Sequence, residues 1–219
     1  MFNKYYPFLI VFSVLFLDQS LKFWVKSNYS LGENIFNYGV LRFDFVENPG
    51  MAFGLSFGGL TSKYILGVFR IFAVLFIGKY IYLLIKGGAH KGLVVIMCLI
   101  FSGALGNIVD NLFYGLIFNS GTSWNSDIDY WVGYSGVSAV FEGGYCGVLE
   151  GCVVDMIHIE FFWPSWAPFG LENTEIFPPV FNVADTFISS SVFILVIFYK
   201  KFVRKQDVDF GVLFSKSLK

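Results

Sequence analysis

The chain has 219 residues, of which 56% are hydrophobic and only 14% are charged. Soluble domains carry about 25% charged residues, so this composition indicates a protein whose solvent is lipid, and the length is enough for one domain. The net charge of −1 gives no sign of a basic, nucleic-acid-binding surface, and the three cysteines form no CxxC pair of the zinc or thioredoxin type.

Four apolar segments predict transmembrane helices. The first covers residues 5–24, and Asp18-Gln19 stands where a signal peptide would have a small-residue cleavage site, so we expect an uncleaved span. The others cover residues 64–85, 92–118 and 180–202. Each is long enough for the roughly 20 residues that a helix needs to cross the hydrocarbon core. The predicted fold is an all-α membrane bundle of four transmembrane helices in a single domain, 1–219.

The connections between these segments differ in character. Residues 27–62 include an alternation of β-branched and aromatic residues around 40–46, which predicts a short strand. Residues 119–179 form a long connection, and its last part, 160–179, is rich in aromatic residues and proline. Such a composition suits a segment that lies on the membrane surface.

Lysine and arginine predict the orientation. Residues 118–178 contain neither, whereas Lys4, Lys86, Lys91 and the basic cluster at 200–205 belong to the opposite side of the predicted bundle. The positive-inside rule therefore places both termini in the cytoplasm and the two long connections outside.

Ionisable residues inside predicted spans are costly and suggest function. Asp18 and Lys22 lie at i and i+4 in the first span, so they can form a pair that faces the bundle. Gly103 and Gly106 in the third span are small enough to let helices approach closely.

Three polar residues follow these glycines at helical spacing. Asn107 can share a face of the third span with Asp110 or with Asn111, so we expect an interhelical hydrogen-bond network there.

Two further acids are the best catalytic candidates. Asp155 lies between apolar residues, and Asp185 falls in the first turn of the predicted fourth helix, where the helix dipole favours an anion. Asn182 is three residues before Asp185, so both can face the bundle. Two close carboxylates tend to share one proton, which is aspartic-protease chemistry. That chemistry needs no cofactor and no metal, and we expect neither.

Other chemistries have weaker support in the sequence. A metallopeptidase would have only the fragment Asp155, His158 and Glu160, without an HExxH motif. A serine hydrolase would need His158 as its base, and the chain has no GxSxG. A small transporter or channel that uses intramembrane acids is the alternative, although the chain has no inverted repeat and its acids gather near one face.

Five short motifs occur in the order typical of one family. They are D-Q-x-x-K at 18–22, N-x-G-x-A-F-G at 48–54, G-A-x-G-N-x-x-D at 103–110, V-V-D at 153–155 and F-N-x-A-D at 181–185. On these motifs the chain resembles the lipoprotein signal peptidases (signal peptidase II) along nearly its whole length.

The resemblance implies a function and a site. Members of that family are bacterial inner-membrane peptidases that cleave prolipoproteins just before a cysteine carrying diacylglycerol, and their catalytic pair corresponds to Asp155 and Asp185. It implies prolipoprotein and membrane lipid as partners, a monomer, and a small external β-cradle at 34–58. It also implies supporting or substrate-positioning roles for Asp18, Lys22, Asn48, Gly50, Asn107, Asp110, Asn182 and Ala184.

The chain departs from the family pattern in two places. Asn111 stands where the family has an arginine, and more than forty residues separate Asp110 from the V-V-D motif. We therefore expect an extended external loop insertion at about 116–150. Cys146 and Cys152 lie in or beside this insertion, in a compartment that permits disulfides. We expect both cysteines to be free thiols and not to form a disulfide bond with each other.

Overall fold

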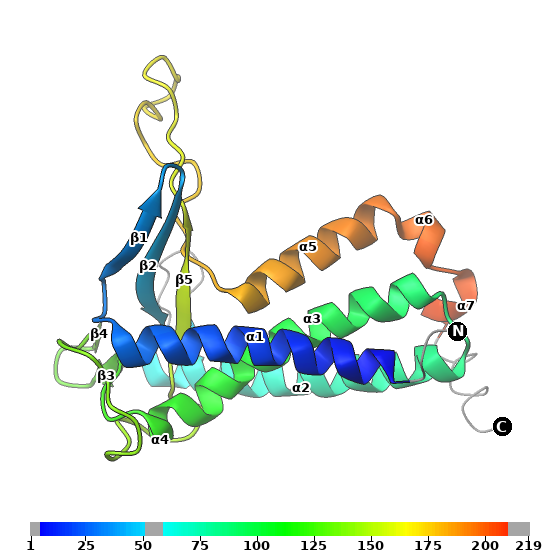
Figure 1. The fold of residues 1–219 in the computed structure, drawn as a ribbon, viewed down its shortest axis with the longest axis horizontal. Coiled ribbons are helices and arrows are strands. Elements are labelled where there is room, and N and C mark those ends of the chain that lie inside the picture. Colours follow the sequence, from blue (N-terminus) through cyan, green and yellow to red (C-terminus); the bar gives the residue numbers. More distant parts are fainter. Residues whose placement is uncertain (1–4, 51–58, 210–219) are drawn as a thin grey trace. The chain divides into compact units, whose positions relative to one another are not determined.

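The computed structural model describes residues 5–50 and 59–209 (Figure 1). They fall into two compact units, which we call the helical unit (residues within 1–19, 67–108 and 183–219) and the sheet unit (residues within 20–66 and 109–182). The elements in chain order are α1 (Tyr6–Asn28), β1 (Asn34–Tyr38), β2 (Leu41–Asn48), α2 (Gly59–Lys86), α3 (Lys91–Val109), η1 (Asp110–Tyr114), α4 (Gly115–Ile117), β3 (Ser123–Asn125), β4 (Tyr130–Val132), β5 (Val153–Ile159), α5 (Val183–Ile197), α6 (Tyr199–Phe202) and α7 (Lys205–Val208).

Within the described residues, three helices are long and apolar enough to cross a membrane. They are α1, α2 and the continuous helix Lys91–Ile117, which contains the π-helical turn η1. The fourth predicted segment forms α5, which is apolar but has only 15 residues. It begins at Val183, and the chain turns at Phe198 before the short α6. By length alone, therefore, three spans are found where the sequence predicts four.

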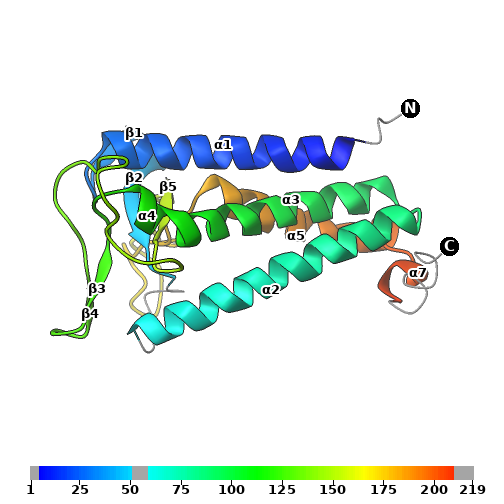
Figure 2. The same cartoon turned by 90° about the horizontal axis from the view of Figure 1, so that it is seen from below.

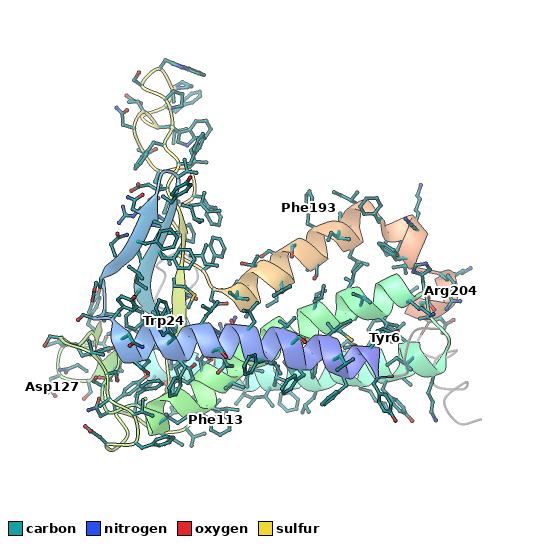
Figure 3. All side chains as sticks on the ribbon, in the orientation of Figure 1. Tyr6, Trp24, Phe113, Asp127, Phe193 and Arg204 are labelled. Carbon is teal, nitrogen blue, oxygen red and sulfur yellow. The ribbon has the colours of Figure 1, made fainter. Side chains whose placement is uncertain are left out.

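Large apolar side chains are exposed along these helices. Phe8, Phe12 and Phe16 stack on one another at successive turns of α1 with ring centroids 6.2 and 6.1 Å apart, and all three are exposed. Phe193 of α5 is exposed as well (Figure 3). A soluble protein rarely exposes so much contiguous apolar surface, so these faces fit contact with lipid.

The helical unit is held by apolar packing and by close helix approach. Its core contains Ile81, Leu84, Leu93, Val94 and Cys98, with contributions from α1 and α5. A Cβ on Gly103 would come within 2.5 Å of the Ala184 carbonyl oxygen, and one on Gly106 within 2.6 Å of Asp18 Oδ2. This confirms the prediction that both glycines permit close approach.

The sheet unit is built on three antiparallel strands in the order β1-β2-β5. The predicted strand around 40–46 is confirmed as β2. The strand β5, which carries the V-V-D motif, was not expected. Of the predicted cradle at 34–58, residues 34–48 form β1 and β2, and 51–58, including the end of the N-x-G-x-A-F-G motif, lie outside the described residues.

The two faces of the β2–β5 pair have different neighbours. Glu47 is the cross-strand partner of Val154, and Val46 is the partner of Asp155. Phe45, Val154 and Met156 pack into one buried cluster with residues of α1, η1 and Phe118. Because successive side chains of a strand point to opposite faces, Asp155 belongs to the face away from that cluster.

Two long loops extend the sheet unit. The segment 116–150 is an extended loop in which β3 pairs with β4 and Trp124 lies 5.4 Å from Trp131, centroid to centroid (Figure 2). The segment 160–179 folds back on itself, since Trp163 N donates to Thr174 O at 2.9 Å. Its aromatic residues Trp166 and Phe169 are almost fully exposed. The prediction that this loop lies on a membrane surface stays a prediction.

Candidate active site

Asp155 lies in the middle of β5 and is almost completely buried. Its Oδ1 accepts a hydrogen bond of 2.7 Å from Asn182 Nδ2, and Asn182 is itself fully buried. A buried carboxylate loses its hydration, so a directed amide donor is the kind of partner that it requires.

A cavity of about 550 Å³ borders Asp155. Its walls come from the end of β2 and from the chain that returns from the 160–179 loop, and they are mostly apolar. The lining residues are Val46, Glu47, Asn48, Pro49, Asp155, Ile176, Phe177, Pro178, Pro179 and Val180.

Gly50 is the next residue in the chain after Pro49, which lines this cavity. Its N–H donates to Asn48 Oδ1 at 2.9 Å, and its φ of +102° is one that glycine adopts without strain. A Cβ there would also meet Leu66 at 3.0 Å. Asn48 and Gly50, both predicted site residues, therefore form one turn beside Asp155.

Lys22 of α1 and Asp110 of η1 form a buried ion pair. Lys22 Nζ lies 2.9 Å from Asp110 Oδ2, and both side chains are fully buried. The same Oδ2 accepts a hydrogen bond of 3.3 Å from the main-chain N–H of Val154, so the ion pair contacts the residue just before Asp155. The predicted pair of Lys22 with Asp18 stays a prediction.

The helical unit brings together the other predicted residues. Asp185 Oδ1 accepts from Asn107 Nδ2 at 2.8 Å, which confirms an interhelical hydrogen bond from the third predicted span. Asp18 Oδ1 accepts from Ala184 N at 2.9 Å. That N–H belongs to the first turn of α5, which has no intrahelical acceptor, so a carboxylate is well placed there. Gln19 Nε2 donates to Asp18 Oδ2 at 3.1 Å.

Asn111, at the position of the family arginine, is hydrogen-bonded to the main chain of Gly151. Its Nδ2 donates to Gly151 O at 2.8 Å, and Gly151 N donates to Asn111 O at 3.2 Å. A Cβ on Gly151 would collide with the Asp110 carbonyl oxygen. Asn111 thus ties the chain just after the 116–150 segment to η1, next to Asp110.

Sequence reasoning missed a second buried ion pair, between Lys26 and Glu47. Both side chains are fully buried. The signal available in the sequence was the four-residue spacing of Lys26 from Lys22, which places both on one face of α1. The partner Glu47 could not be found in this way, because it lies on a strand.

A polar cluster at the other end of the sheet was also missed. His158 bridges two carboxylates, with Nδ1 2.8 Å from Asp44 Oδ2 and Nε2 2.6 Å from Glu175 Oε1. Burial lowers the pKa of His158, but the two hydrogen bonds to Asp44 and Glu175 outweigh it and leave the pKa raised. Burial raises the pKa of Asp44, and hydrogen bonds from Asn34, His158 and Arg42 outweigh it, so that pKa is lowered.

The cysteines are thiols, and the metal-ligating residues are scattered. Cys146 and Cys152 are both free, which is the alternative expected from the sequence. Burial raises the pKa of Cys146 to about 11 and that of Cys152 to about 12. In the part of the chain that the structure describes, no three His, Cys, Asp or Glu side chains are grouped to hold a metal ion.

Comparisons with known proteins agree on one family. A family model described as signal peptidase (SPase) II matches residues 10–201. A protein of Porphyromonas gingivalis (strain W83) named lipoprotein signal peptidase is 38% identical over 204 residues, which cover 89% of this chain and 82% of that protein. One of Amoebophilus asiaticus with the same name is 31% identical, covering 89% and 76%.

A solved structure shares the fold. It is titled "Bacterial membrane enzyme structure by the in meso method at 1.9 A resolution", and it matches with a TM-score of 0.50 and 20% identity over 90% of this chain and 93% of that one.

Proposed function

The chain belongs to the signal peptidase II family of aspartic peptidases, and we propose that it removes the signal peptide from diacylglyceryl-modified bacterial prolipoproteins, with Asp155 and Asp185 as its catalytic pair. The observation that carries the proposal is Asp155 itself: a buried carboxylate that accepts a hydrogen bond from the Asn182 amide, on the wall of a mostly apolar cavity. The relatives of the preceding comparison are named lipoprotein signal peptidases, which supports the substrate class.

The two carboxylates have matching surroundings. Each accepts a short hydrogen bond from an asparagine, Asp155 from Asn182 and Asp185 from Asn107. Asn182 is only three residues from Asp185 in the chain, so the donor to Asp155 is covalently close to the second acid. An amide donor fixes the position of one carboxylate oxygen and so orients the carboxyl group.

The reaction needs one proton between the two acids. Close carboxylates do not both ionise readily, so the ionised member takes a proton from water while the protonated member donates a hydrogen bond to the scissile carbonyl oxygen. Water oxygen bonds to the carbonyl carbon, the C–N bond then breaks, and the proton passes to the leaving nitrogen. No covalent intermediate with the protein forms.

The remaining residues have supporting roles in this proposal. The cavity beside Asp155 receives the residues around the scissile bond, because its walls are apolar and its volume suits a short peptide segment with part of an acyl chain. The supporting residues are Asp18, Lys22, Asn48, Gly50, Asn107, Asp110, Asn182 and Ala184.

We also propose the membrane topology. Helix α5 is the fourth span, continued by α6, and both termini lie in the cytoplasm of the bacterial inner membrane. The long connections 27–62 and 119–179 lie outside, since residues 118–178 hold no lysine or arginine. The protein acts as a monomer, a single domain with an external insertion, in contact with membrane lipid.

The test is cleavage of a diacylglyceryl-modified precursor peptide by the purified protein in mixed micelles. We expect Asp155→Asn and Asp185→Asn each to abolish cleavage, and Asp127→Asn, at an exposed loop position, to keep the rate of the unaltered protein. Activity that survives in either of the first two variants would show that the dyad is wrong. Loss of activity on chelation would point to a metallopeptidase, and ion or solute flux in proteoliposomes without cleavage would point to the transporter alternative.

A further inference from the structure

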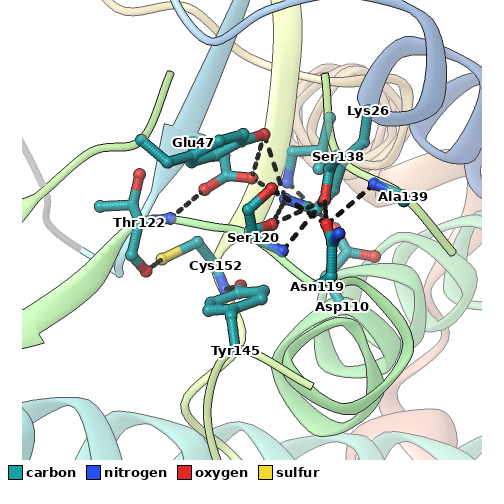
Figure 4. A network of polar contacts seen from close by, with 12 residues as sticks. Lys26, Glu47, Asp110, Asn119, Ser120, Thr122, Ser138, Ala139, Tyr145 and Cys152 are labelled. Carbon is teal, nitrogen blue, oxygen red and sulfur yellow. Dashed lines mark hydrogen bonds and ion pairs between the residues drawn. The ribbon is translucent and has the colours of Figure 1, made fainter. Parts of the chain in front are cut away.

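Lys26 occupies a closed cage of polar and aromatic groups (Figure 4). It lies one helical turn after Lys22 in α1, and its side chain is fully buried. Its Nζ donates to the Glu47 carboxylate and, at 3.0 Å, to the Ser120 carbonyl oxygen. Three rings complete the cage, with Nζ 4.9–5.2 Å from the centroids of Phe118, Tyr134 and Tyr145.

Glu47 is fully satisfied by the same cage. Its Oε1 accepts from Lys26 and from the Tyr134 hydroxyl at 3.4 Å, and its Oε2 accepts from Thr122 N at 2.6 Å. Ser120, Thr122 and Tyr134 all belong to the 116–150 insertion. A buried ion pair is stable only when its remaining donors and acceptors are met, so the insertion supplies what this pair needs.

Glu47 lies on β2, the strand that pairs with the strand carrying Asp155. Glu47 faces Val154 across β2 and β5, and the next pair along the strands is Val46 with Asp155. Val154 is held in turn by Asp110, whose partner is Lys22. Lys22 is thus linked through the Asp110 carboxylate to Val154. Lys26, one turn later on α1, is paired with Glu47, the cross-strand partner of Val154.

We infer that Lys26 and Glu47 are positioning residues for Asp155. The insertion supplies the hydrogen-bond partners that keep this buried pair in place. The inference rests on the proposed function, because it gives the pair a task only if Asp155 takes part in cleavage. The Glu47 carboxylate meets Lys26 and Thr122 in the cage, although Glu47 also contributes to the cavity wall, and the pair fixes the main chain from which Asp155 projects. A displacement of a catalytic group by about 1 Å can cost roughly a hundredfold in rate, so such support matters to the reaction.

The test compares two variants that should both lose stability, only one of which removes Lys26. Lys26→Met removes the cation, and Leu84→Ala truncates a buried side chain of the helical unit, far along the chain from the sheet. Both are expected to lower the melting temperature of the purified protein. We expect kcat to fall about tenfold or more in Lys26→Met with KM changed less than about threefold, and kcat to stay within about twofold in Leu84→Ala.

A second variant covers the case in which Lys26→Met does not fold. Lys26→Met combined with Glu47→Gln leaves no unpaired buried charge, and Gln can still accept from Thr122 N. We expect this double variant to recover most of the melting temperature but to keep the reduced kcat, together with a shifted pH profile of kcat. If the pair had only a structural role, the double variant would recover kcat together with its melting temperature.

The outcomes separate this inference from the proposed function. If Lys26→Met and the double variant match Leu84→Ala in kcat and in pH profile at equal melting temperature, the positioning role is wrong while Asp155→Asn remains inactive. If Asp155→Asn itself cleaves the precursor peptide, the proposed function is wrong, and the positioning role falls with it.

Discussion

Asn182 donates a hydrogen bond of 2.7 Å to Asp155, and through it the last two motifs of the chain meet. The backbone supports the same junction, because Phe181 N donates to Ile157 O at 2.9 Å and Ile157 N donates to Phe181 O at 2.7 Å. The segment that leads into α5 is thus paired with the strand that carries Asp155.

Loss of this amide should reduce catalysis more than folding. In Asn182→Ala, Asp155 loses its directed donor, and a hydrogen bond to a charged group contributes about 1.5–3 kcal/mol. We expect kcat to fall by roughly ten- to a hundredfold, measured on the diacylglyceryl-modified peptide. Asn125→Ala, on an exposed part of the insertion, is the control and should keep kcat. Equal rates in the two variants would contradict the role of Asn182.

The Lys22–Asp110 pair should be essential to stability. Asp110→Asn removes the carboxylate that lies 2.9 Å from the fully buried Lys22 ammonium, and breaking a buried ion pair costs about 3–5 kcal/mol. Thermal or denaturant unfolding in micelles should show the loss. Lys22→Met combined with Asp110→Asn should be more stable than Asp110→Asn alone, and a double variant that is less stable would argue against burial of the pair.

Gly106 should not tolerate alanine. The added Cβ would lie 2.6 Å from Asp18 Oδ2, which is itself fixed by Gln19, so the helices must separate or Asp18 must leave the N–H of Ala184. We expect Gly106→Ala to lower the unfolding free energy by about 1–3 kcal/mol, as overpacking does. Gly78→Ala is the control, because its Cβ meets only the Phe101 ring, at 3.2 Å. Melting temperatures of both variants provide the measurement.

The bridge at His158 should make stability depend on pH. The folded pKa of His158 is raised by Asp44 and Glu175, so its contribution is complete below about pH 6.5 and is lost as the pH rises through the folded pKa. The lowered pKa of Asp44 acts in the other direction, and its contribution is lost only in acid, below about pH 4.

Unfolding of the purified protein between about pH 6 and pH 9 isolates the histidine. We expect stability to fall across this window in the unaltered protein and to change less in His158→Gln. Parallel pH curves for the two proteins would show that His158 is not protonated in the bridge.

Cys146, within the insertion, and Cys152, just after it, should react slowly as thiols. With a pKa of about 11, Cys146 has on the order of a thousandth of its thiol ionised at pH 8, and Cys152, with a pKa of about 12, has less. Alkylation by iodoacetamide, followed by mass spectrometry, should be slow in the native protein and fast in denaturant without a reductant. Labelling that requires reduction first would reveal a disulfide.

The sequence predicts long local patterns well and pairings between distant segments poorly. Three apolar segments gave helices close to their predicted bounds, although α2 begins earlier, at Gly59, because a polar first turn is invisible to hydrophobicity. β5 was missed because Val153 to Met156 are all buried, including Asp155, so no alternation of polar and apolar residues marks it as a strand.

The candidate site divides in the same way. Motif order identified Asp155 and Asp185 as candidates, but the donors Asn182 and Asn107 act across 27 and 78 positions, which no local pattern encodes. Lys26 and Glu47 are separated by 21 positions and belong to a helix and a strand, so their pairing depended on the tertiary fold.

The back of the β2–β5 pair offers a different way to inhibit such an enzyme. The cage around Lys26 draws on the insertion at Ser120, Thr122 and Tyr134, on the face opposite Asp155. If the insertion supports Asp155 as inferred above and the cavity receives lipoprotein as proposed, a small molecule that displaced the insertion from this face would slow turnover without competing with the substrate. Its inhibition would be noncompetitive, and a high concentration of substrate would not overcome it.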